Sequence, residues 1–352
     1  MSPDAAAEVP PVDAALAGAS VVLVMGAGGV GKTTLSAAMG VRASLAHGRR
    51  VLVVTVDPAR RLADALGLAA MRADPVLVPT DGDGTLWTLM IDMASSWDRL
   101  VERHAPDAGT RDALLANRLY RTLTRRFVQS HDYIALDLLV EMADHDRYDL
   151  VVVDTPPSSH VLDVLDAPER MLDFLGSRFL TWLTAPYRSP ITRAAAAPFL
   201  SVAERLLGGP FLADIAEFFW LFSSLRPGFE TRARAVQDRL ADPATRHVVV
   251  QSTDPASSAG ADRLVAALAE RGRRVDLRMV NRILPESVAD EDAGGDPAVA
   301  AVVDEARRDH ELLAALAGQS VPVVSVPWSR RPVGDLDGLA ALVEPVEPGI
   351  GL

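Results

Sequence analysis

Cysteine is absent from the chain, which has 352 residues. Disulfides, thiolate-bound zinc, iron–sulfur clusters and catalysis by a thiol are therefore excluded. Long apolar runs are absent as well, because no stretch reaches the roughly 18 residues of a membrane-spanning helix. Residues 1–19 carry acids and prolines but lack the basic start of a secretion signal. We expect a cytoplasmic protein that is not an integral membrane protein.

Lysine is almost absent. Of the 35 basic residues only Lys32 is a lysine, and the others are arginines. This composition suggests a bias that replaces lysine wherever arginine will serve, so the remaining lysine should lie where a compact ammonium group is needed. The formal net charge of −12 argues against nucleic acid as the main partner, because a phosphate backbone repels an acidic surface.

The sequence around Lys32 has the pattern of a phosphate-binding loop. An apolar run over residues 21–25 leads into a glycine-rich turn, and a helix-compatible run follows. Glycines let backbone N–H groups face phosphate oxygens, and the helix N-terminus adds the positive end of its dipole. The Lys32 ammonium can contact the outer phosphates and the Thr33 hydroxyl can bind Mg²⁺. With Gly26 and Gly31 at the other fixed positions, the pattern predicts a triphosphate site.

Apolar runs of strand length alternate with helical patterns along the chain. The runs cover residues 20–25, 51–56, 86–92, 150–153, 247–251, 275–281 and 322–326. Helical patterns cover residues 93–147, 161–240, 258–271 and 297–317. This alternation predicts an α/β fold of the P-loop NTPase type, with a doubly wound, mostly parallel sheet and a helical insertion subdomain. Ligands of such folds bind at the carboxyl ends of the strands.

The same patterns divide the chain. We expect a disordered N-terminus over 1–19, a first part of the P-loop core over 20–160 with a helical segment at about 93–147, a helical subdomain over 161–240, a second part of the core over 241–340 and a flexible C-terminus over 341–352.

Two carboxylates follow predicted strands. Asp57 can orient or deprotonate the water that attacks the γ-phosphate, and Asp154 can hold Mg²⁺ directly or through water. Aspartate is also a preferred helix N-cap, so each residue alone has a structural interpretation. The phosphate loop in the same chain favours the nucleotide role for both.

The order of motifs along residues 20–340 resembles the ArsA-type anion-transporting ATPase family. That family includes arsenite pump ATPases and the ATPases that target tail-anchored membrane proteins, and it belongs with MinD- and ParA-like proteins to the group with a deviant Walker A motif. The resemblance lies in GGVGKTT, in DPAxxL at Asp57–Leu62, in DTPPSSH at Asp154–His160, in VNRILP at Val280–Pro285 and in VPWSRRPVG at Val326–Gly334.

The resemblance implies an ATP site with Mg²⁺. The loop residues that would bind ATP are Gly26, Gly28, Gly29, Val30, Gly31, Lys32, Thr33 and Thr34. Asp57 would position the hydrolytic water. Asp154 would be the acid of the segment known as switch II, a mobile loop that runs to His160 and senses the γ-phosphate. Lys32 joins these two acids in catalysis, and Thr33, Asp57 and Asp154 would hold the metal.

The base and the nucleoside would contact a second set of residues. Asn281 resembles the amide that recognises adenine, Asp254 lies where the family has an acid near the nucleoside, and Pro327 with its neighbours resembles the loop that packs on the base. Two structural interpretations stay open: Asn281 as a helix N-cap and His160 as an ordinary loop histidine.

The chain departs from the family at Ala27, where relatives have a lysine that crosses a dimer interface to the partner's phosphates. We therefore expect either a homodimer or a heterodimer with a paralogous ATPase that keeps this lysine. Arg60 or Arg61 could replace it as an arginine finger, or hydrolysis could be slow. Without cysteine there is no soft site for arsenite and no CxxC zinc clamp.

The family places a nucleotide-controlled cargo surface in the helices over 161–240. A hydrophobic or membrane-protein cargo could contact Phe211, Phe218, Phe219, Trp220, Leu221 and Phe222. Aromatic residues at helical spacing are more often core, so that interpretation stays open. Two other functions also remain: a hydrolysis-poor, nucleotide-binding regulatory subunit, and a MinD-like ATPase positioned on a membrane surface. The acidic, proline-broken C-terminus at 343–348 disfavours the latter.

Overall fold

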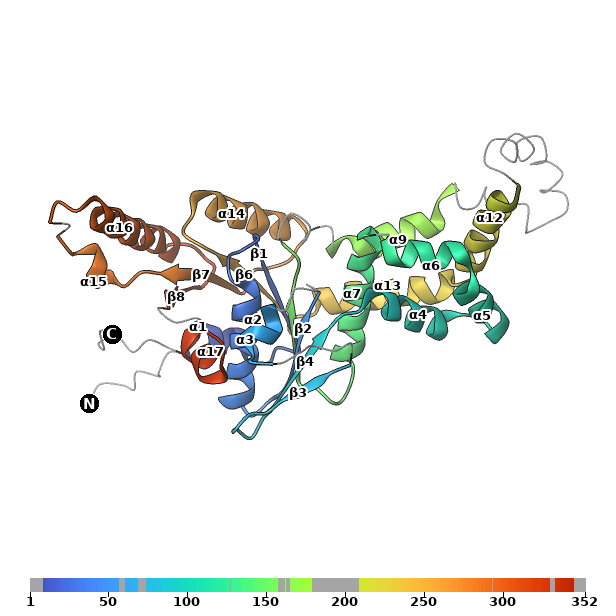
Figure 1. Cartoon of the computed structure of the whole chain (residues 1–352), viewed down its shortest axis with the longest axis horizontal. Coiled ribbons are helices and arrows are strands. Elements are labelled where there is room, and N and C mark those ends of the chain that lie inside the picture. The colour runs from blue at the N-terminus through green and yellow to red at the C-terminus, as the bar shows by residue number, and fades with distance from the viewer. Residues whose placement is uncertain are drawn as a thin grey trace. The chain divides into compact units, whose positions relative to one another are not determined.

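The structure is a computed structural model of the whole chain (Figure 1). It describes residues 9–56, 61–68, 74–126, 128–157, 162, 165–178, 209–292, 294–329 and 333–344. The chain divides into two compact units. The first comprises Met1–Ile91, Glu141–Leu162 and Ala241–Leu352, and the second comprises Asp92–Val140 and Asp163–Leu240.

The first unit contains an eight-stranded sheet in the order β3-β4-β2-β5-β1-β6-β7-β8. Its strands are β1 (Val21–Gly26), β2 (Arg50–Thr55), β3 (Val76–Val78), β4 (Thr85–Met90), β5 (Leu150–Asp154), β6 (Thr245–Gln251), β7 (Leu277–Ile283) and β8 (Val323–Pro327). All neighbouring strands are parallel except β3 and β4. The central strands β1 and β5 are buried along their whole length, as continuous apolar runs require in a sheet covered on both faces.

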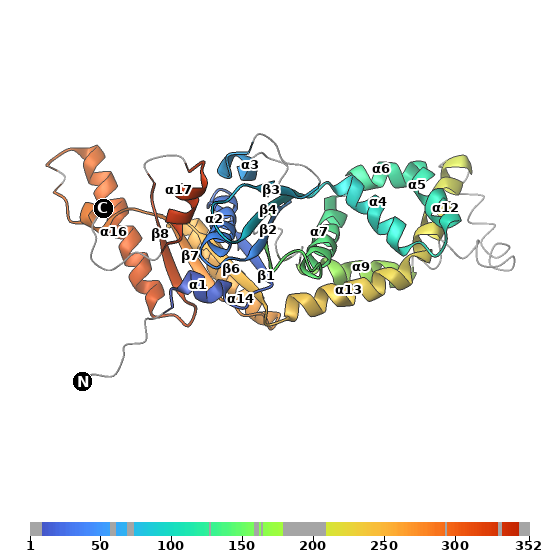
Figure 2. The same ribbon diagram turned by 90° about the horizontal axis from the view of Figure 1, so that it is seen from below.

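Seven described helices belong wholly to the first unit. They are α1 (Pro11–Leu16), α2 (Lys32–Leu45), α3 (Arg61–Ala65), α14 (Pro255–Glu270), α15 (Glu286–Ala289), α16 (Pro297–Ala317) and α17 (Leu336–Leu342). Alternate residues of β7 show that both faces of the sheet are covered. Leu277 and Met279 join the core that contains α2, whereas Arg278 meets Asp262 of α14 and Val280 packs with Leu316 of α16. Figure 2 shows α2 and α14 on either side of the strands. The predicted doubly wound α/β fold of the P-loop NTPase type is confirmed.

Two elements of the first unit differ from the sequence-based expectation. Strand β3 was not predicted, because three residues with an exposed Leu77 show no periodicity. Helix α1 lies in the segment expected to be disordered. It is held by Asp13, whose carboxylate accepts hydrogen bonds from Arg42 at 2.6 and 2.7 Å and pairs with His47 at 2.8 Å, and by burial of Leu16 in the core.

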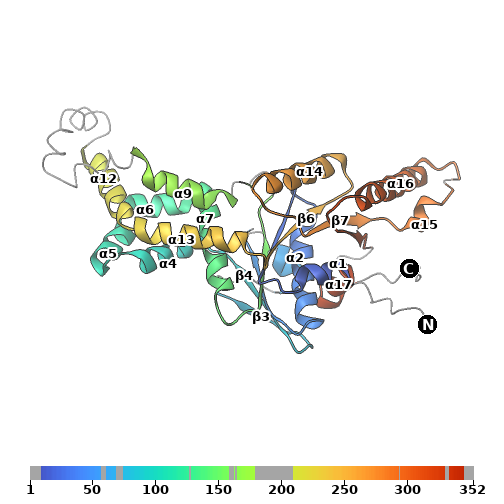
Figure 3. The ribbon, with the colours of Figure 1, turned by 180° about the vertical axis from the view of Figure 1, so that it is seen from behind.

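The second unit is helical throughout its described residues. It is built from α4 (Met93–His104), α5 (Ala108–Ala116), α6 (Arg118–Arg126), α9 (Ala167–Gly176), α12 (Gly209–Ser224) and most of α7 (Val128–Ala143) and α13 (Arg226–Ala241), and α12 packs against α5 and α6 (Figure 3). The unit takes in residues 92–140, whereas the expected helical subdomain spanned only 161–240. No helix in the described parts of either unit has the length and apolar character needed to cross a membrane.

The predicted aromatic stripe on α12 divides between core and surface. Phe218 and Phe222 are buried together with Trp97 and Phe229, whereas Trp220 is 38% exposed. The side chain of Phe211, also proposed for the cargo surface, lies outside the described residues. The core interpretation therefore holds for Phe218 and Phe222.

Candidate nucleotide-binding site

The loop between β1 and α2 depends on glycine at both of its ends. A Cβ atom on Gly26 would overlap the carbonyl oxygen of Val250 in β6, and one on Gly31 would overlap the Nδ2 atom of Asn281 in β7. Gly31 also has φ +99°, a conformation that favours glycine. By contrast, Cβ atoms on Gly28 and Gly29 would meet nothing within 4 Å. The ends of the loop are packed tightly, and its middle faces open space.

Lys32 is the first residue of α2 and is 8% exposed. Its Nζ atom donates a hydrogen bond of 2.9 Å to the backbone carbonyl of Ala27, so the ammonium group folds back across the loop. Gly31 forms the N-cap of α2 and has no side chain to cap the first N–H groups of the helix. A positive charge and the N–H groups at the start of α2 therefore lie together, which suits binding of phosphate oxygens.

A carboxylate and two hydroxyls meet beside this loop. Asp154 ends β5, the strand between β1 and β2, and is 2% exposed. Its Oδ2 atom accepts hydrogen bonds from Thr33 Oγ1 at 2.7 Å and from Thr55 Oγ1 at 3.0 Å. Carboxylate and hydroxyl oxygens are ligands that Mg²⁺ prefers, so Asp154 and Thr33 fit a magnesium ion, with Thr55 orienting the carboxylate. Thr55 was not predicted, and its only signal in the sequence is its place at the end of β2.

Asn281 lies inside β7 and contacts the loop. Its Nδ2 atom donates a hydrogen bond of 2.7 Å to the carbonyl of Val30, and its Oδ1 atom accepts one of 2.9 Å from the N–H of Arg282. The alternative interpretation of Asn281 as a helix N-cap is wrong, because the residue belongs to a strand. The side chain of Val30 itself is buried in the core, so only its backbone is available to a ligand.

The other two residues predicted to contact the nucleoside lie near the carboxyl ends of β6 and β8, the strands on either side of β7. Asp254 caps α14, where its Oδ1 atom accepts hydrogen bonds from the N–H groups of Ala256 at 2.9 Å and Ser257 at 3.0 Å. Pro327 ends β8, and Trp328 after it donates its N–H to Ile283 at 2.8 Å while its side chain is 49% exposed. The structure thus places Pro327 at the carboxyl end of β8 and Asn281 near the carboxyl end of the adjacent strand β7.

Asp57, Arg60 and His160 lie outside the described residues. Arg61 begins α3 and is exposed. The roles predicted for these residues therefore stay predictions.

The doubly wound sheet and the loop that joins β1 to α2 define the class of the protein, a P-loop NTPase. A family model described as "Anion-transporting ATPase" matches residues 19–295, which is more than half of the chain. The chain belongs to this family, as the order of its motifs predicted.

Relatives differ in how much of the chain they match. A protein of Streptomyces coelicolor named "Uncharacterized protein SCO2128" is 32% identical over 269 residues, which cover 75% of this chain and 63% of the relative. "ATPase GET3B" of Arabidopsis thaliana is 28% identical over 75% of this chain and 64% of its own length. "ATPase GET3" of Kluyveromyces lactis is 28% identical over 44% of this chain and 46% of its own length. The chain spans less than two thirds of the length of each.

Proposed function

We propose that the chain is a Mg²⁺-dependent ATPase of the ArsA type that works as a dimeric switch in the cytoplasm. The proposal depends on one arrangement: Thr33 donates to Asp154, and Lys32 folds back across a loop whose central glycines face open space. Family membership and relatives named as ATPases support the same activity. Thr33 and Asp154 would hold Mg²⁺, which neutralises charge on the phosphates when bound.

The loop's own groups contribute to the expected catalysis. Phosphoryl transfer places negative charge on the oxygens of the transferred group, and fixed donors that face those oxygens stabilise the transition state. The Lys32 ammonium and the N–H groups at the start of α2 are such donors, because α2 and the packed glycines hold them in position. Asp57 would orient the attacking water.

Ala27 bears on whether the isolated chain turns over quickly. Its side chain cannot provide the charge that relatives obtain from lysine, so we place this chain in a pair with a lysine-bearing paralogue. A hydrolysis-poor regulatory subunit is the second candidate, and the same residue favours it. We expect slow ATP turnover by the wild-type chain alone and about a tenfold or larger increase for Ala27→Lys. Fast turnover by a wild-type homodimer would contradict the need for a paralogue.

The helical second unit is the proposed site of cargo binding. Among the stripe residues of α12 whose side chains the structure describes, Trp220 is exposed, and the partly buried Phe219 and Leu221 flank it in sequence. A hydrophobic or membrane-protein cargo would contact this face in a manner controlled by the nucleotide. Fluorescence of a hydrophobic dye should change between the ADP and ATP states and lose that change in Trp220→Ser. An unchanged signal in the wild-type chain would count against the cargo surface.

The single lysine provides a direct test of ATP binding. Lys32 carries the only side-chain amine in the chain, so a mild acylating reagent modifies this site and the N-terminal amine alone. Mg²⁺–ATP should slow acylation of Lys32 by about tenfold or more, because bound phosphates occupy its N–H donors. Peptide mass spectrometry measures both sites, and the N-terminal amine is the internal control. Equal rates with and without Mg²⁺–ATP would overturn the proposed site.

A further inference from the structure

A side chain from another strand holds the phosphate loop. Asn281 of β7 donates its amide N–H to the carbonyl of Val30, the residue before Gly31. The approach is so close that Gly31 has no room for a Cβ atom beside the Asn281 amide. Asn281 is 9% exposed and its hydrogen bond to Val30 is buried, where an unmade hydrogen bond is costly. Gly31 is therefore required by this contact as well as by its positive φ.

The backbone around Asn281 fixes the direction of this amide. Arg282 has φ +67° and is the only residue other than glycine with a positive φ in the described chain. Its N–H donates to Asn281 Oδ1, and the pairing of β7 with β8 shifts register between Asn281 and Ile283. A bulge of this kind re-aims a side chain next to a site. With its oxygen bound by Arg282, the amide must present its NH₂ group to Val30.

We propose that Asn281 is a positioning residue for the phosphate loop. Its hydrogen bond sets the position of the Val30–Gly31 peptide and thereby of the first N–H groups of α2. Asn281 then raises the affinity of the loop for phosphate groups, whether or not the ligand carries a base. The second N–H of the amide is left for a base, so one side chain links the two parts of the ligand. This inference rests on the proposed function, in which the loop binds a triphosphate.

A ligand without a base separates positioning from base recognition. We would measure Mg²⁺–ATP and Mg²⁺–tripolyphosphate by their protection of Lys32 from acylation, in the wild-type chain and in Asn281→Asp and Asn281→Ala. Both substitutions remove the N–H donor to Val30. We expect each variant to bind tripolyphosphate about tenfold or more weakly, because the loss of one buried hydrogen bond is felt at the loop, and to bind ATP more weakly by at least the same factor.

An equally buried asparagine provides the control. Asn117 is also 9% exposed and makes its side-chain contacts in the second unit, where it accepts hydrogen bonds from Leu119 and Tyr120. Asn117→Ala should lower the midpoint of thermal unfolding and leave the protection of Lys32 unchanged. Thermal unfolding of the Asn281 variants shows whether any loss of binding reflects loss of the fold.

The outcomes separate this inference from the proposed function. A loss of ATP affinity with unchanged tripolyphosphate affinity would mean that Asn281 reads only the base, and unchanged affinity for both ligands would mean that the contact has no role in binding. Either result overturns the inference. Binding of ATP but not of tripolyphosphate by the wild-type chain would also overturn it, because the loop would not hold phosphates by itself. Failure of the wild-type chain to bind either ligand would instead overturn the proposed function.

Discussion

The two edges of the sheet in the first unit are built from different chemistry. At the carboxyl edge, the Lys32 ammonium donates to a carbonyl of its own loop, hydroxyls contact Asp154, and the central glycines of the loop face open space. At the amino edge, arginines contact carboxylates and carbonyls of neighbouring strands. At the carboxyl edge, the Lys32 ammonium can give up its hydrogen bond to a backbone carbonyl and donate to a ligand instead. At the amino edge, the charged side chains join parts of the fold.

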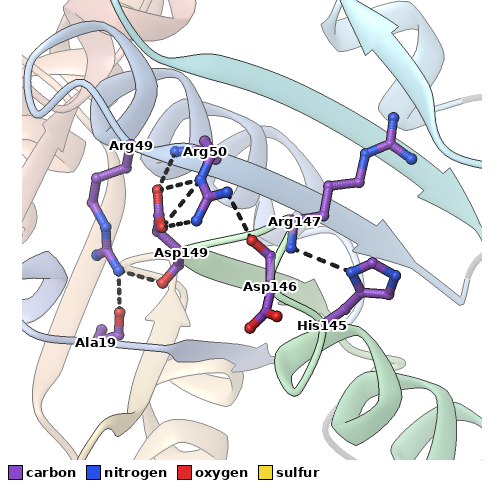
Figure 4. Close-up of polar contacts among 7 residues, drawn as sticks. All are labelled: Ala19, Arg49, Arg50, His145, Asp146, Arg147 and Asp149. Atoms are coloured by element: carbon purple, nitrogen blue, oxygen red, sulfur yellow. Dashed lines mark hydrogen bonds and ion pairs between the residues drawn. The ribbon is translucent and has the colours of Figure 1, made fainter.

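Figure 4 shows the amino edge in detail. Arg49 donates to the carbonyls of Ala19 and Asp149, both at 2.5 Å. Arg50 pairs with the Asp149 carboxylate through Nη2 at 2.6 Å and through its backbone N–H at 2.8 Å, and Arg50 Nη1 donates to the carbonyl of Asp146 at 2.7 Å. These bonds tie β2 to the start of β5. Substitutions here should therefore change stability, and substitutions at the carboxyl edge should change binding.

Substitution of Lys32 should give the largest effect. Lys32→Ala removes the charge beside the phosphates and should lower ATP turnover by about 10²- to 10³-fold, as loss of one transition-state donor does. Lys32→Arg keeps the charge but offers a planar group, and should restore little. Phosphate release measures the rate, and thermal unfolding without nucleotide should change little. A large fall in stability with retained turnover would erase the distinction between the edges.

Acid should destabilise the fold through a buried histidine. His247 of β6 is 4% exposed, and burial, with help from the nearby Arg273, lowers its pKa to about 4. The unfolded chain binds this proton below about pH 6.5, so the free energy of unfolding should fall by about 3 kcal/mol as the pH drops from 6.5 to 4. Urea unfolding of wild type and His247→Leu measures the difference. Parallel pH profiles would contradict the prediction.

A third test uses the two threonines that share one carboxylate oxygen. Thr33→Val removes the proposed magnesium ligand and should weaken the Mg²⁺-dependent part of ATP binding by about tenfold or more, whereas Thr33→Ser should retain it. Thr55→Val removes the other donor to Asp154 but no proposed ligand, so its effect on the Mg²⁺ dependence should be smaller. Titration of Mg²⁺ at fixed ATP separates the three variants. Equal effects of both valine substitutions would show that only the orientation of Asp154 matters.

These contrasts also mark what the sequence could predict. Buried parallel strands read as continuous apolar runs, and the loop pattern has fixed spacing, so the sheet and the positions of Lys32, Thr33 and Asp154 at its carboxyl edge were predictable. The contact of Asn281 with Val30 was not, because it joins residues 251 positions apart across a strand order that the sequence does not reveal.

The amino edge was missed for a related reason. Arg49 precedes β2 and Arg50 begins it, where arginine has no local signature, and the partner that they share, Asp149, lies about 100 residues away. Helix α1 has only six residues, and its order depends on Asp13 meeting Arg42. In each case the deciding interaction is a contact of a charged side chain with a residue far away in the sequence, and no periodicity records such a contact.

The smallest expected effect isolates the amino edge. The hydrogen bonds from Arg50 hold the pKa of Asp149 at about 2, below its usual value of 3.8. A carboxyl group with a lowered pKa in the fold stabilises it above about pH 4 and loses that contribution as the pH falls towards 2. Because the Asp149 side chain is 37% exposed, solvent weakens the pair, and Asp149→Asn should cost only about 1 kcal/mol at pH 7. Urea unfolding should show this difference disappearing near pH 2, with protection of Lys32 by Mg²⁺–ATP unchanged at pH 7. A loss of that protection would mean that the two edges are coupled through β2 and β5.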